Sequence, residues 1–394
     1  MTTRPLDGIT VISLEQAVAA PFATRQLADL GARVIKVERP GKGDFARGYD
    51  ESVHGQSSYF VWLNRSKESL TLDLKSDAGR AVLDELLAGA DVFVQNLAPG
   101  AAARMGLGAD ELGKRFPRLV VCDVSGFGAT GPWSDRKAYD LLVQAESGLM
   151  SVTGTPADMV KVGISVADIA AGMYAYSGIL TALLQRANTG HAPAVEVSLF
   201  EALAEWMGSP AYYTEYGGTA PARVGGQHAT IAPYGPYPTA DGDVLVVAVQ
   251  NDREWVRFCT DLLEDERLAT AERFARNSAR VANRAELNEL ITARLAKLDT
   301  ETAVKLLDTA GIATARLRTV PQFLEHPVLA GRERWRDVGT PGGPVRALLP
   351  PATLKGVPPR MDPVPAVGEH SEQILRALGR DETEIERLHA DGVI

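Results

Sequence analysis

Residues 160–180 read VKVGISVADIAAGMYAYSGIL, and this stretch is predicted to form the centre of the protein. The pattern predicts a short buried strand over Val160–Val166 and a helix over Ile169–Gln185. Apolar side chains recur on one face of that helix, at Ile169, Met173, Tyr176, Leu180 and Leu183. The helix is otherwise rich in Ala and Gly, which permit close backbone packing, so we expect it to be buried on nearly all sides.

Asp168 stands between the predicted strand and helix and is expected to be the helix N-cap. A carboxylate in that position faces free backbone N–H groups and the positive end of the helix dipole, which keeps it ionised. Two interpretations follow: a plain capping residue, or a catalytic acid at the edge of a buried helix. The local pattern alone favours the cap.

The chain has 394 residues, enough for two domains or more with an ample core. Its hydrophobic content of 45% and charged content of 23% are typical of a soluble globular enzyme. The net charge of −9, with no basic stripe, argues against a nucleic-acid partner.

Two cysteines, Cys122 and Cys259, lack metal-ligand spacing, so we expect a reducing cytoplasmic location. Residues 1–7 contain no apolar run typical of a signal peptide. The one membrane-like segment, Ile169–Leu184, would be about 24 Å long as a helix, shorter than a bilayer core. We therefore interpret it as a core helix and expect no membrane association.

Strands and helices alternate along the first half of the chain, which predicts an α/β domain with a largely parallel, Rossmann-like sheet. The expected strands are Ile9–Leu14, Arg33–Glu38, Leu70–Leu74, Val92–Gln95, Leu119–Val124 and Ala194–Val197. The expected helices are Pro21–Leu30, Ala78–Leu87, Asp110–Phe116 and Ser198–Met207.

The composition and periodicity of the sequence change after this region. Residues 210–238 are rich in Gly, Pro and Tyr without periodicity, which indicates a boundary or functional loop. A smaller α+β domain is then predicted, with its strand and helices at Val244–Val249, Arg253–Leu263, Arg284–Leu298 and Thr300–Thr309. Eight prolines between Pro341 and Pro365 predict an extended strap, and two short helices, Ser371–Leu378 and Glu382–His389, end the chain. The expected domains are 1–209, 210–330 and 331–394, the last a strap and tail returning to the large domain.

The hexapeptide Gly126-Phe127-Gly128-Ala129-Thr130-Gly131 matches the dinucleotide-binding fingerprint. Its context does not, because Pro132 and Trp133 follow where a long helix should begin. A glycine-rich turn that lets a substrate approach the backbone fits better. Glu38 could be the ribose-binding acid of such a fold, but the first strand–helix turn, residues 15–20, has no glycine to admit a pyrophosphate. We therefore expect no nicotinamide.

Several cations and donors follow strand ends, namely Arg39, Lys75, Asn96, Arg104 and Lys137. In an α/β sheet ligands bind beyond the carboxyl ends of the strands, so these side chains could converge on one anionic ligand. Taken singly, each is more often a surface residue. Tyr139 and Asp140 could be turn residues, and His228 lies in a glycine-flanked loop.

Four blocks in order resemble the class III CoA transferases, the CaiB/BaiF-type family that includes formyl-CoA transferase and the related α-methylacyl-CoA racemases. The blocks are LGARVIKVERPG at 30–41, NLAPGAAARMG at 96–106, SGFG at 125–128, and Asp168 with GILTALL at 178–184. The resemblance extends from Pro5 to His370 and so covers nearly the whole chain.

The resemblance implies an interlocked homodimer of two-domain subunits in which Asp168 is the nucleophile. It also implies that CoA contacts Val18, Ala19, Arg39, Leu72, Lys75, Asn96, Leu97, Arg104, Met105 and Lys137. The family often has Phe where this chain has Leu97, which weakens an expected stacking contact. The racemase branch has a His-Asp pair where this chain has Tyr139-Asp140.

By this resemblance the reaction is transfer of CoA from an acyl-CoA to a free carboxylate through aspartyl anhydride and aspartyl-CoA thioester intermediates. Coenzyme A enters only as acyl-CoA substrate and product, and no metal is expected. Residues 139–150 and 228–234 resemble the branch acting on succinyl-, mesaconyl- or itaconyl-sized dicarboxylates, for which Arg47 and His228 are candidate contacts, as are Tyr139 and Asp140. For Arg47 the alternative is a surface salt bridge, and for His228 it is a loop-ordering hydrogen bond. Two alternatives to transfer remain: a racemase or isomerase on the same fold, and a non-catalytic acyl-CoA-binding protein.

Overall fold

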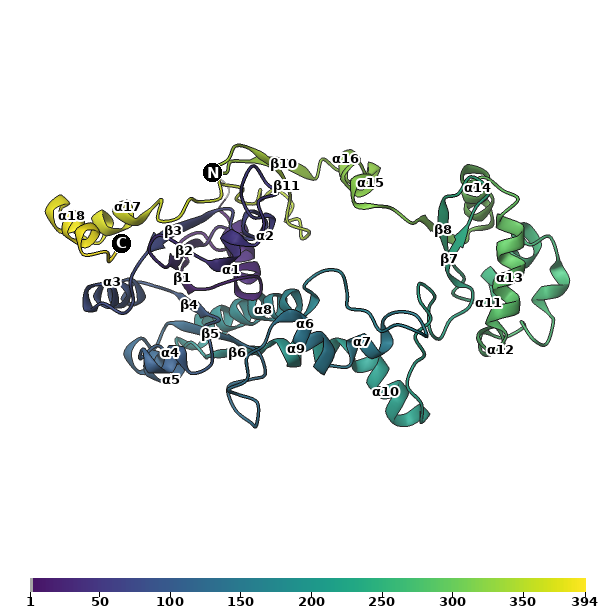
Figure 1. Ribbon diagram of the computed structural model, residues 1–394, viewed down its shortest axis with the longest axis horizontal. Helices are drawn as coiled ribbons and strands as arrows, with labels where there is room; N and C mark the ends of the chain where they lie inside the picture. The colour runs from purple at the N-terminus through teal and green to yellow at the C-terminus, as the bar shows by residue number, and fades with distance from the viewer. Residues whose placement is uncertain (1–2) are drawn as a thin grey trace. The chain divides into compact units, whose positions relative to one another are not determined.

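The computed structural model describes residues 3–394 and divides the chain into two compact units (Figure 1). The first unit comprises the chain up to Ser147 together with Val162–Met207 and Ala330–Ile394. The second comprises Gly148–Lys161 and Gly208–Leu329. Each unit has its own hydrophobic core.

The short segment Gly148–Lys161 departs from the expected division, since we placed it in the large domain and it clusters with the second unit. The Arg223 guanidinium attaches it there by donating to the carbonyls of Ser151, Thr155 and Pro156. Contacts of this kind join residues about 70 positions apart in the chain, so no local pattern could reveal them.

A six-stranded parallel sheet organises the first unit, in the order β3-β2-β1-β4-β5-β6. Its strands are β1 (Thr10–Leu14), β2 (Arg33–Glu38), β3 (Lys67–Thr71), β4 (Val92–Gln95), β5 (Val120–Ser125) and β6 (Val195–Ser198). This is the strand order of a doubly wound dinucleotide-binding fold, so the predicted Rossmann-like α/β class is confirmed. Central positions such as Ile12, opposite Ile35 and Phe93, are fully buried, as expected for a sheet covered on both faces.

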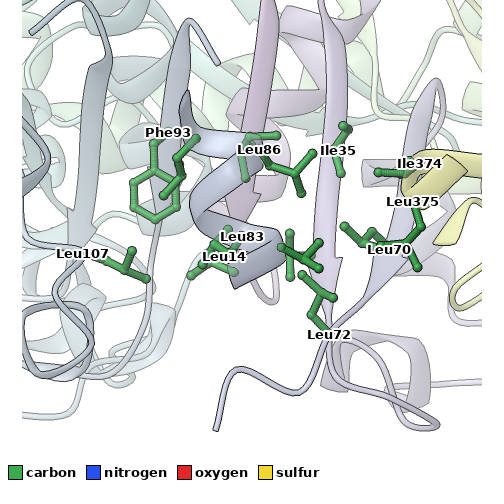
Figure 2. Close-up of a cluster of buried hydrophobic side chains, with 14 of the residues drawn as sticks. Leu14, Ile35, Leu70, Leu72, Leu83, Leu86, Phe93, Leu107, Ile374 and Leu375 are labelled. Atoms are coloured by element: carbon green, nitrogen blue, oxygen red, sulfur yellow. The ribbon is translucent and has the colours of Figure 1, made fainter. Parts of the chain in front are cut away.

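Helices cover both faces of this sheet (Figure 1). They are α1 (Ala19–Asp29), α2 (Ser58–Leu63), α3 (Asp77–Ala88), α4 (Ala101–Arg104), α5 (Ala109–Arg115), α6 (Asp140–Glu146), α8 (Val166–Thr189) and α9 (Leu199–Trp206), with a 3-10 turn η1 (Phe45–Gly48). The C-terminal helices α17 (Ser371–Ala377) and α18 (Glu382–Ala390) return to the same sheet. Figure 2 shows Ile374 and Leu375 of α17 packed with Leu70 of β3 and Leu72.

β3 begins three residues earlier than the expected strand Leu70–Leu74. The cause is Lys67, whose charged side chain is buried in the sheet and bonded to Glu15. A charged residue at a strand start lowers the apparent hydrophobicity of the segment, so the pattern placed the strand too late.

α8 is the long central helix, but its start differs from the prediction. It begins at Val166, which places Asp168 in its first turn, after Ser165 at the N-cap position. No strand forms over Val160–Val166: Val160 and Ile164 are 44% and 59% exposed, and the Val162 N–H is taken by the Gln144 side chain. By length and composition α8 could cross a membrane, but it packs here against α1, α6, α9, β5 and β6.

α8 approaches α1 closely at Gly172. A Cβ at this position would lie 2.7 Å from the Ala19 carbonyl oxygen and 3.0 Å from the Phe22 ring. The absence of a side chain therefore lets the first turns of α8 lie against the beginning of α1, the helix that follows β1.

The second unit is built on an antiparallel sheet of β7 (Tyr234–Pro238), β8 (Val244–Ala248) and β9 (Ala313–Arg316). Its helical elements are α7 (Leu149–Val152), α10 (Gly208–Gly217), α11 (Asp252–Arg257), η2 (Phe258–Leu262), η3 (Glu266–Ala269), α12 (Asn277–Ala282), α13 (Arg284–Leu295), α14 (Thr300–Ala310), α15 (Val320–Leu324) and α16 (Pro327–Gly331), which runs into the first unit. Buried Trp255, Phe258 and Phe274 form its core. Residues 210–238, expected to be irregular, contain most of α10 and all of β7.

The proline-rich strap is not wholly extended, because β11 (Val345–Leu348) forms an antiparallel hairpin with β10 (Trp335–Val338). Its prolines flank the strand and do not interrupt the ladder, which agrees with the exclusion of proline from paired positions. The Arg65 guanidinium donates to the Leu348 carbonyl and thereby attaches the hairpin to the sheet unit.

Candidate active site

A cavity of about 390 Å³ opens at the carboxyl ends of β1, β2 and β3. It is lined by Leu14, Glu15, Gln16, Val37, Glu38, Arg39, Pro40, Gly43, Asp44, Leu72, Asp73, Leu74, Lys75, Arg80, Leu97 and Met105. Its size is that of a small-molecule site, and its place is the one where open α/β sheets bind ligands. Four acids are part of this lining, and its apolar side chains and three cations suit a heterocyclic, phosphorylated ligand.

The turn between β1 and α1 borders this cavity and is shaped without glycine. The Asn96 side chain accepts from the Gln16 N–H and donates to the Gln16 carbonyl, both at 2.8 Å. Ala17 has a φ of 63°, a left-handed conformation, and its N–H bonds to the Asp44 carboxylate. Asn96 therefore holds the turn rather than pointing free into the cavity.

A buried charge network lies beneath the cavity. The Lys36 ammonium lies 2.8 Å from Asp44 and 3.4 Å from Glu15, and the Lys67 ammonium lies 2.7 Å from Glu15. All four side chains are completely buried. Burial lowers the pKa of Lys67 to about 8, against the opposing attraction of Glu15. The network joins β1, β2 and β3 to η1, because Glu15 follows β1, Lys36 lies in β2, Lys67 begins β3 and Asp44 is the N-cap of η1.

Glu38, the residue at the position of a ribose-binding acid, is fully engaged. Burial opposes its ionisation, but hydrogen bonds from Arg47 and the charge of Lys36 hold the pKa of Glu38 at about 2. Its two oxygens accept from Arg47, Ser69 and the Asp44 N–H. These four hydrogen bonds occupy the acceptor positions of Glu38, so it cannot also bind the hydroxyl groups of a nucleotide ribose. The strand order of a dinucleotide-binding fold is therefore not matched by a free ribose-binding acid at this position.

Arg47 is the ion-pair partner of Glu38, and its contact with a substrate carboxylate stays a prediction. Its Nε and Nη2 bind both oxygens of Glu38, Nη1 donates to the Pro365 carbonyl, and the guanidinium lies 3.6 Å from the centre of the Phe60 ring. The fork that would hold a substrate carboxylate is occupied within the protein.

Asp168 does not occupy the environment expected from the sequence. It is partly buried in the first turn of α8, and no hydrogen bond from the described residues reaches its carboxylate. Burial, and secondarily the charge of Asp140, raise the pKa of Asp168 to about 7. The prediction that Asp168 is the N-cap of the helix is therefore wrong, because Ser165 holds that position, and the raised pKa is the opposite of the shift that a capping carboxylate would show.

The predicted CoA contacts separate into groups. Arg39, Leu72, Lys75, Leu97 and Met105 come together in the cavity wall. Val18 and Ala19 are buried where α1 begins. Arg104 and Lys137 are exposed and lie outside the wall of this cavity.

Tyr139 and His228, the predicted substrate contacts, lie outside the wall of this cavity. Tyr139 is 63% exposed just before α6. His228 is in the second unit, where its ring stacks on Tyr234 and its Nδ1 accepts from the Thr230 N–H, the loop-ordering contact given as its alternative.

The first glycine of the hexapeptide is packed against its own chain. A Cβ at Gly126 would come within 2.2 Å of the Ala138 methyl group. This close approach belongs to the segment leading into α6, and it places Tyr139 and Asp140 near the end of β5, while Gly128 and Gly131 have no such close neighbour.

Two residues of the site were missed from the sequence. Arg80 lines the cavity from α3, and its Nε donates to the Leu74 carbonyl at 3.0 Å. Its spacing after Lys75, in the first turn of a helix following β3, was the available signal. Gln144 is completely buried and bonds to Asp140 and to the Val162 N–H, which no periodicity indicates.

The chain is similar to known proteins over nearly its full length. A family model described as CoA-transferase family III matches residues 6–371. Succinyl-CoA:glutarate CoA-transferase of Mus musculus is 35% identical, with 99% of this chain and 90% of that protein covered. Succinyl-CoA--D-citramalate CoA-transferase of Chloroflexus aurantiacus is 33% identical, with 99% and 98% covered. A CAIB/BAIF family protein from Brucella suis has a solved structure that matches with a TM-score of 0.84 and 34% identity, covering 96% of this chain and 100% of that one.

Proposed function

The chain belongs to CoA-transferase family III, and from that premise we propose that it moves CoA from a small dicarboxylyl-CoA to a free dicarboxylate through covalent intermediates on Asp168. The observation that carries the proposal is the position of Asp168 in the first turn of α8, four residues before Gly172, where a Cβ would lie 2.7 Å from the Ala19 carbonyl oxygen of α1. α1 follows the turn that borders the cavity, so one ligand could reach both the cavity and the carboxylate.

The reaction begins with the ionised Asp168 carboxylate. One of its oxygens attacks the thioester carbonyl carbon, the carbon–sulfur bond breaks, and the electron pair leaves on the CoA thiolate. The thiolate then attacks the aspartyl carbonyl carbon of the mixed anhydride, and the donor acid departs as a carboxylate. The acceptor carboxylate repeats both steps in reverse and restores Asp168. Covalent catalysis suits this exchange because each step passes between acyl groups of similar energy.

The cavity suits the adenosine end of CoA. Leucine and methionine side chains offer an apolar surface for the base, and Arg39, Lys75 and Arg80 lie around it. None of these three cations forms an ion pair with a described residue, so their charge is available to phosphate groups. An acidic protein can thus bind a polyanion at one local rim.

We expect Arg80→Ala to raise the KM for acyl-CoA about tenfold, the effect of losing one charge-assisted phosphate contact. If Arg80 binds the 3′-phosphate, the variant and wild type should have the same KM for the corresponding dephospho-CoA thioester. Arg115→Ala, in the Arg115–Asp84 surface pair, is the control and should leave both values unchanged. An equal rise in KM for both thioesters would instead indicate that Arg80 binds the diphosphate.

The substrate class is supported by relatives whose names specify succinyl-CoA with glutarate, D-citramalate or mesaconate. We expect wild-type enzyme to use succinyl-CoA at least tenfold better than butyryl-CoA with glutarate as acceptor, measured as kcat/KM by chromatography of the CoA esters. A preference for butyryl-CoA would contradict the dicarboxylate assignment and leave CoA transfer intact. Exchange of the α-proton in deuterated water without transfer would indicate racemase chemistry instead.

We also propose an interlocked homodimer. Large apolar side chains on the central helix are uncovered in the single chain, with Met173, Tyr174 and Leu184 exposed to 38%, 37% and 64%. Such a surface on a helix otherwise built into a core suggests a second subunit against it. Sedimentation at low micromolar concentration should show a dimer, and a folded monomer there would contradict the proposal.

A further inference from the structure

Asp140 makes two hydrogen bonds that join separate parts of the site. Its Oδ1 accepts from the Ala167 N–H in the first turn of α8 at 2.8 Å, and its Oδ2 accepts from Gln144 Nε2 at 2.7 Å. Gln144 in turn accepts from the Val162 N–H at 2.8 Å and is completely buried. The segment entering α8 is therefore held at two points by side chains of α6.

We propose that Asp140 is a positioning residue for the transfer reaction, capping α8 in place of Asp168 and leaving the Asp168 carboxylate free of internal hydrogen bonds and aimed by the first turn. This inference rests on the proposed role of Asp168 as nucleophile. It replaces the substrate contact expected of Asp140 from the sequence.

The physical argument starts from the helix N-terminus, which has unpaired N–H groups that stabilise a nearby carboxylate. In this protein a second acid, 28 positions earlier in the chain, accepts one of those N–H groups. Asp168 is then denied that bond and faces a like charge. A carboxylate with fewer hydrogen bonds is more basic and less well solvated, and both properties favour attack on a thioester carbonyl.

The groups around Asp168 support this arrangement. α1, α6, α9, β5 and β6 pack against α8, and the charge among the described residues that acts on the pKa of Asp168 is that of Asp140. At Gly172, α1 presents Ala19 and Phe22, which are uncharged. The charge of Asp168 also acts on the Tyr49 phenol: burial, and then the charges of Asp44 and Asp168, raise the pKa of Tyr49 to about 12, so it stays protonated and can donate a hydrogen bond.

The first test is the pH profile of kcat/KM. In wild type the rate should rise with pH to a plateau above a midpoint near 7, because Asp168 must be ionised to attack. Asp140→Asn removes the like charge, so the midpoint should fall by about one unit while the plateau falls about tenfold. Asp140→Ser, which keeps a neutral capping oxygen, should show the same shift and covers the case in which the Asn variant does not fold. Asp381→Asn is the matched control. Asp381 is the N-cap of α18 and accepts a hydrogen bond from the Glu384 N–H, and its substitution should not move the midpoint.

An unshifted midpoint in both Asp140 variants would overturn the proposal. Complete loss of turnover at every pH in a folded variant would also overturn it, because Asp140 would then act on the substrate itself.

A second measurement does not depend on activity and so separates this inference from the proposed function. Asp168→Asn should raise the unfolding temperature increasingly between pH 5 and 7, since the ionised carboxylate is what destabilises the fold. In protein that also carries Asp140→Asn, the rise in unfolding temperature caused by Asp168→Asn should reach its maximum about one pH unit lower than in the otherwise wild-type protein. Equal pH dependence in the two backgrounds would show that Asp140 does not act on Asp168, even in an enzyme that transfers no CoA to the acids tried.

Discussion

Asp168→Asn is expected to reduce CoA transfer by several orders of magnitude while the protein stays folded. The amide is nearly the same size but cannot form the anhydride, so the covalent route is lost and not merely slowed. Intact-protein mass spectrometry after incubation with succinyl-CoA should show a CoA adduct on wild type and none on the variant. Asp110→Asn, in the first turn of α5, is a matched control with an unchanged rate.

The same substitution should stabilise the protein above neutral pH. The pKa of Asp168 is raised from 3.8 to about 7, so the stability contributed by its protonated form is full below 3.8 and is lost as pH rises through 7. One pKa unit corresponds to about 1.4 kcal/mol, and solvent screening reduces the total for a partly exposed group. A gain of about 2 kcal/mol at pH 8 is therefore expected. Near-native transfer by Asp168→Asn would refute the nucleophile assignment whatever its stability.

Lys36→Met should cost about 3–5 kcal/mol of unfolding free energy, the largest stability effect that we expect from one substitution. The methionine fills a similar volume but leaves the Asp44 carboxylate without its 2.8 Å partner in a fully buried position. Asp44 also accepts hydrogen bonds from the Ala17 and Ala46 N–H groups, so the turn between β1 and α1 and the segment η1 should become less ordered. Because that turn borders the cavity, the affinity for acyl-CoA should fall as well. Urea denaturation at pH 7 measures the first effect and calorimetric titration with CoA the second.

Arg33→Met is the control on the same strand. Arg33 pairs with Glu68 at the surface, where its side chain is 43% exposed, so its loss should cost less than about 1 kcal/mol. Equal losses for the two variants would mean that the buried network contributes no more than a surface pair and would contradict its role beneath the cavity.

Local patterns located most of the regular structure. β2 and β4 have the predicted bounds, and β1, α1, α3 and α9 lie within two residues of theirs, because apolar runs between turn signals reflect burial on both faces of a parallel sheet. The errors fall where polar groups are buried or backbone groups bond to side chains. β3 was placed late because Lys67 is buried, and the strand before α8 does not exist because Gln144 takes the Val162 N–H.

The sequence by itself determined the family, the α/β class, Asp168 as the candidate nucleophile and five of the side chains that line the cavity, since these depend on motifs and on strand ends that meet at one sheet edge. The tertiary structure alone decided what surrounds each charge. It paired Arg47 with Glu38, brought Arg80 into the cavity wall, and gave the cap of α8 to Asp140 rather than Asp168. Hydrophobic periodicity records which side chains leave water, but hydrogen bonds and ion pairs between distant segments depend on the path of the folded chain, and they set the charge and reactivity of the carboxylate.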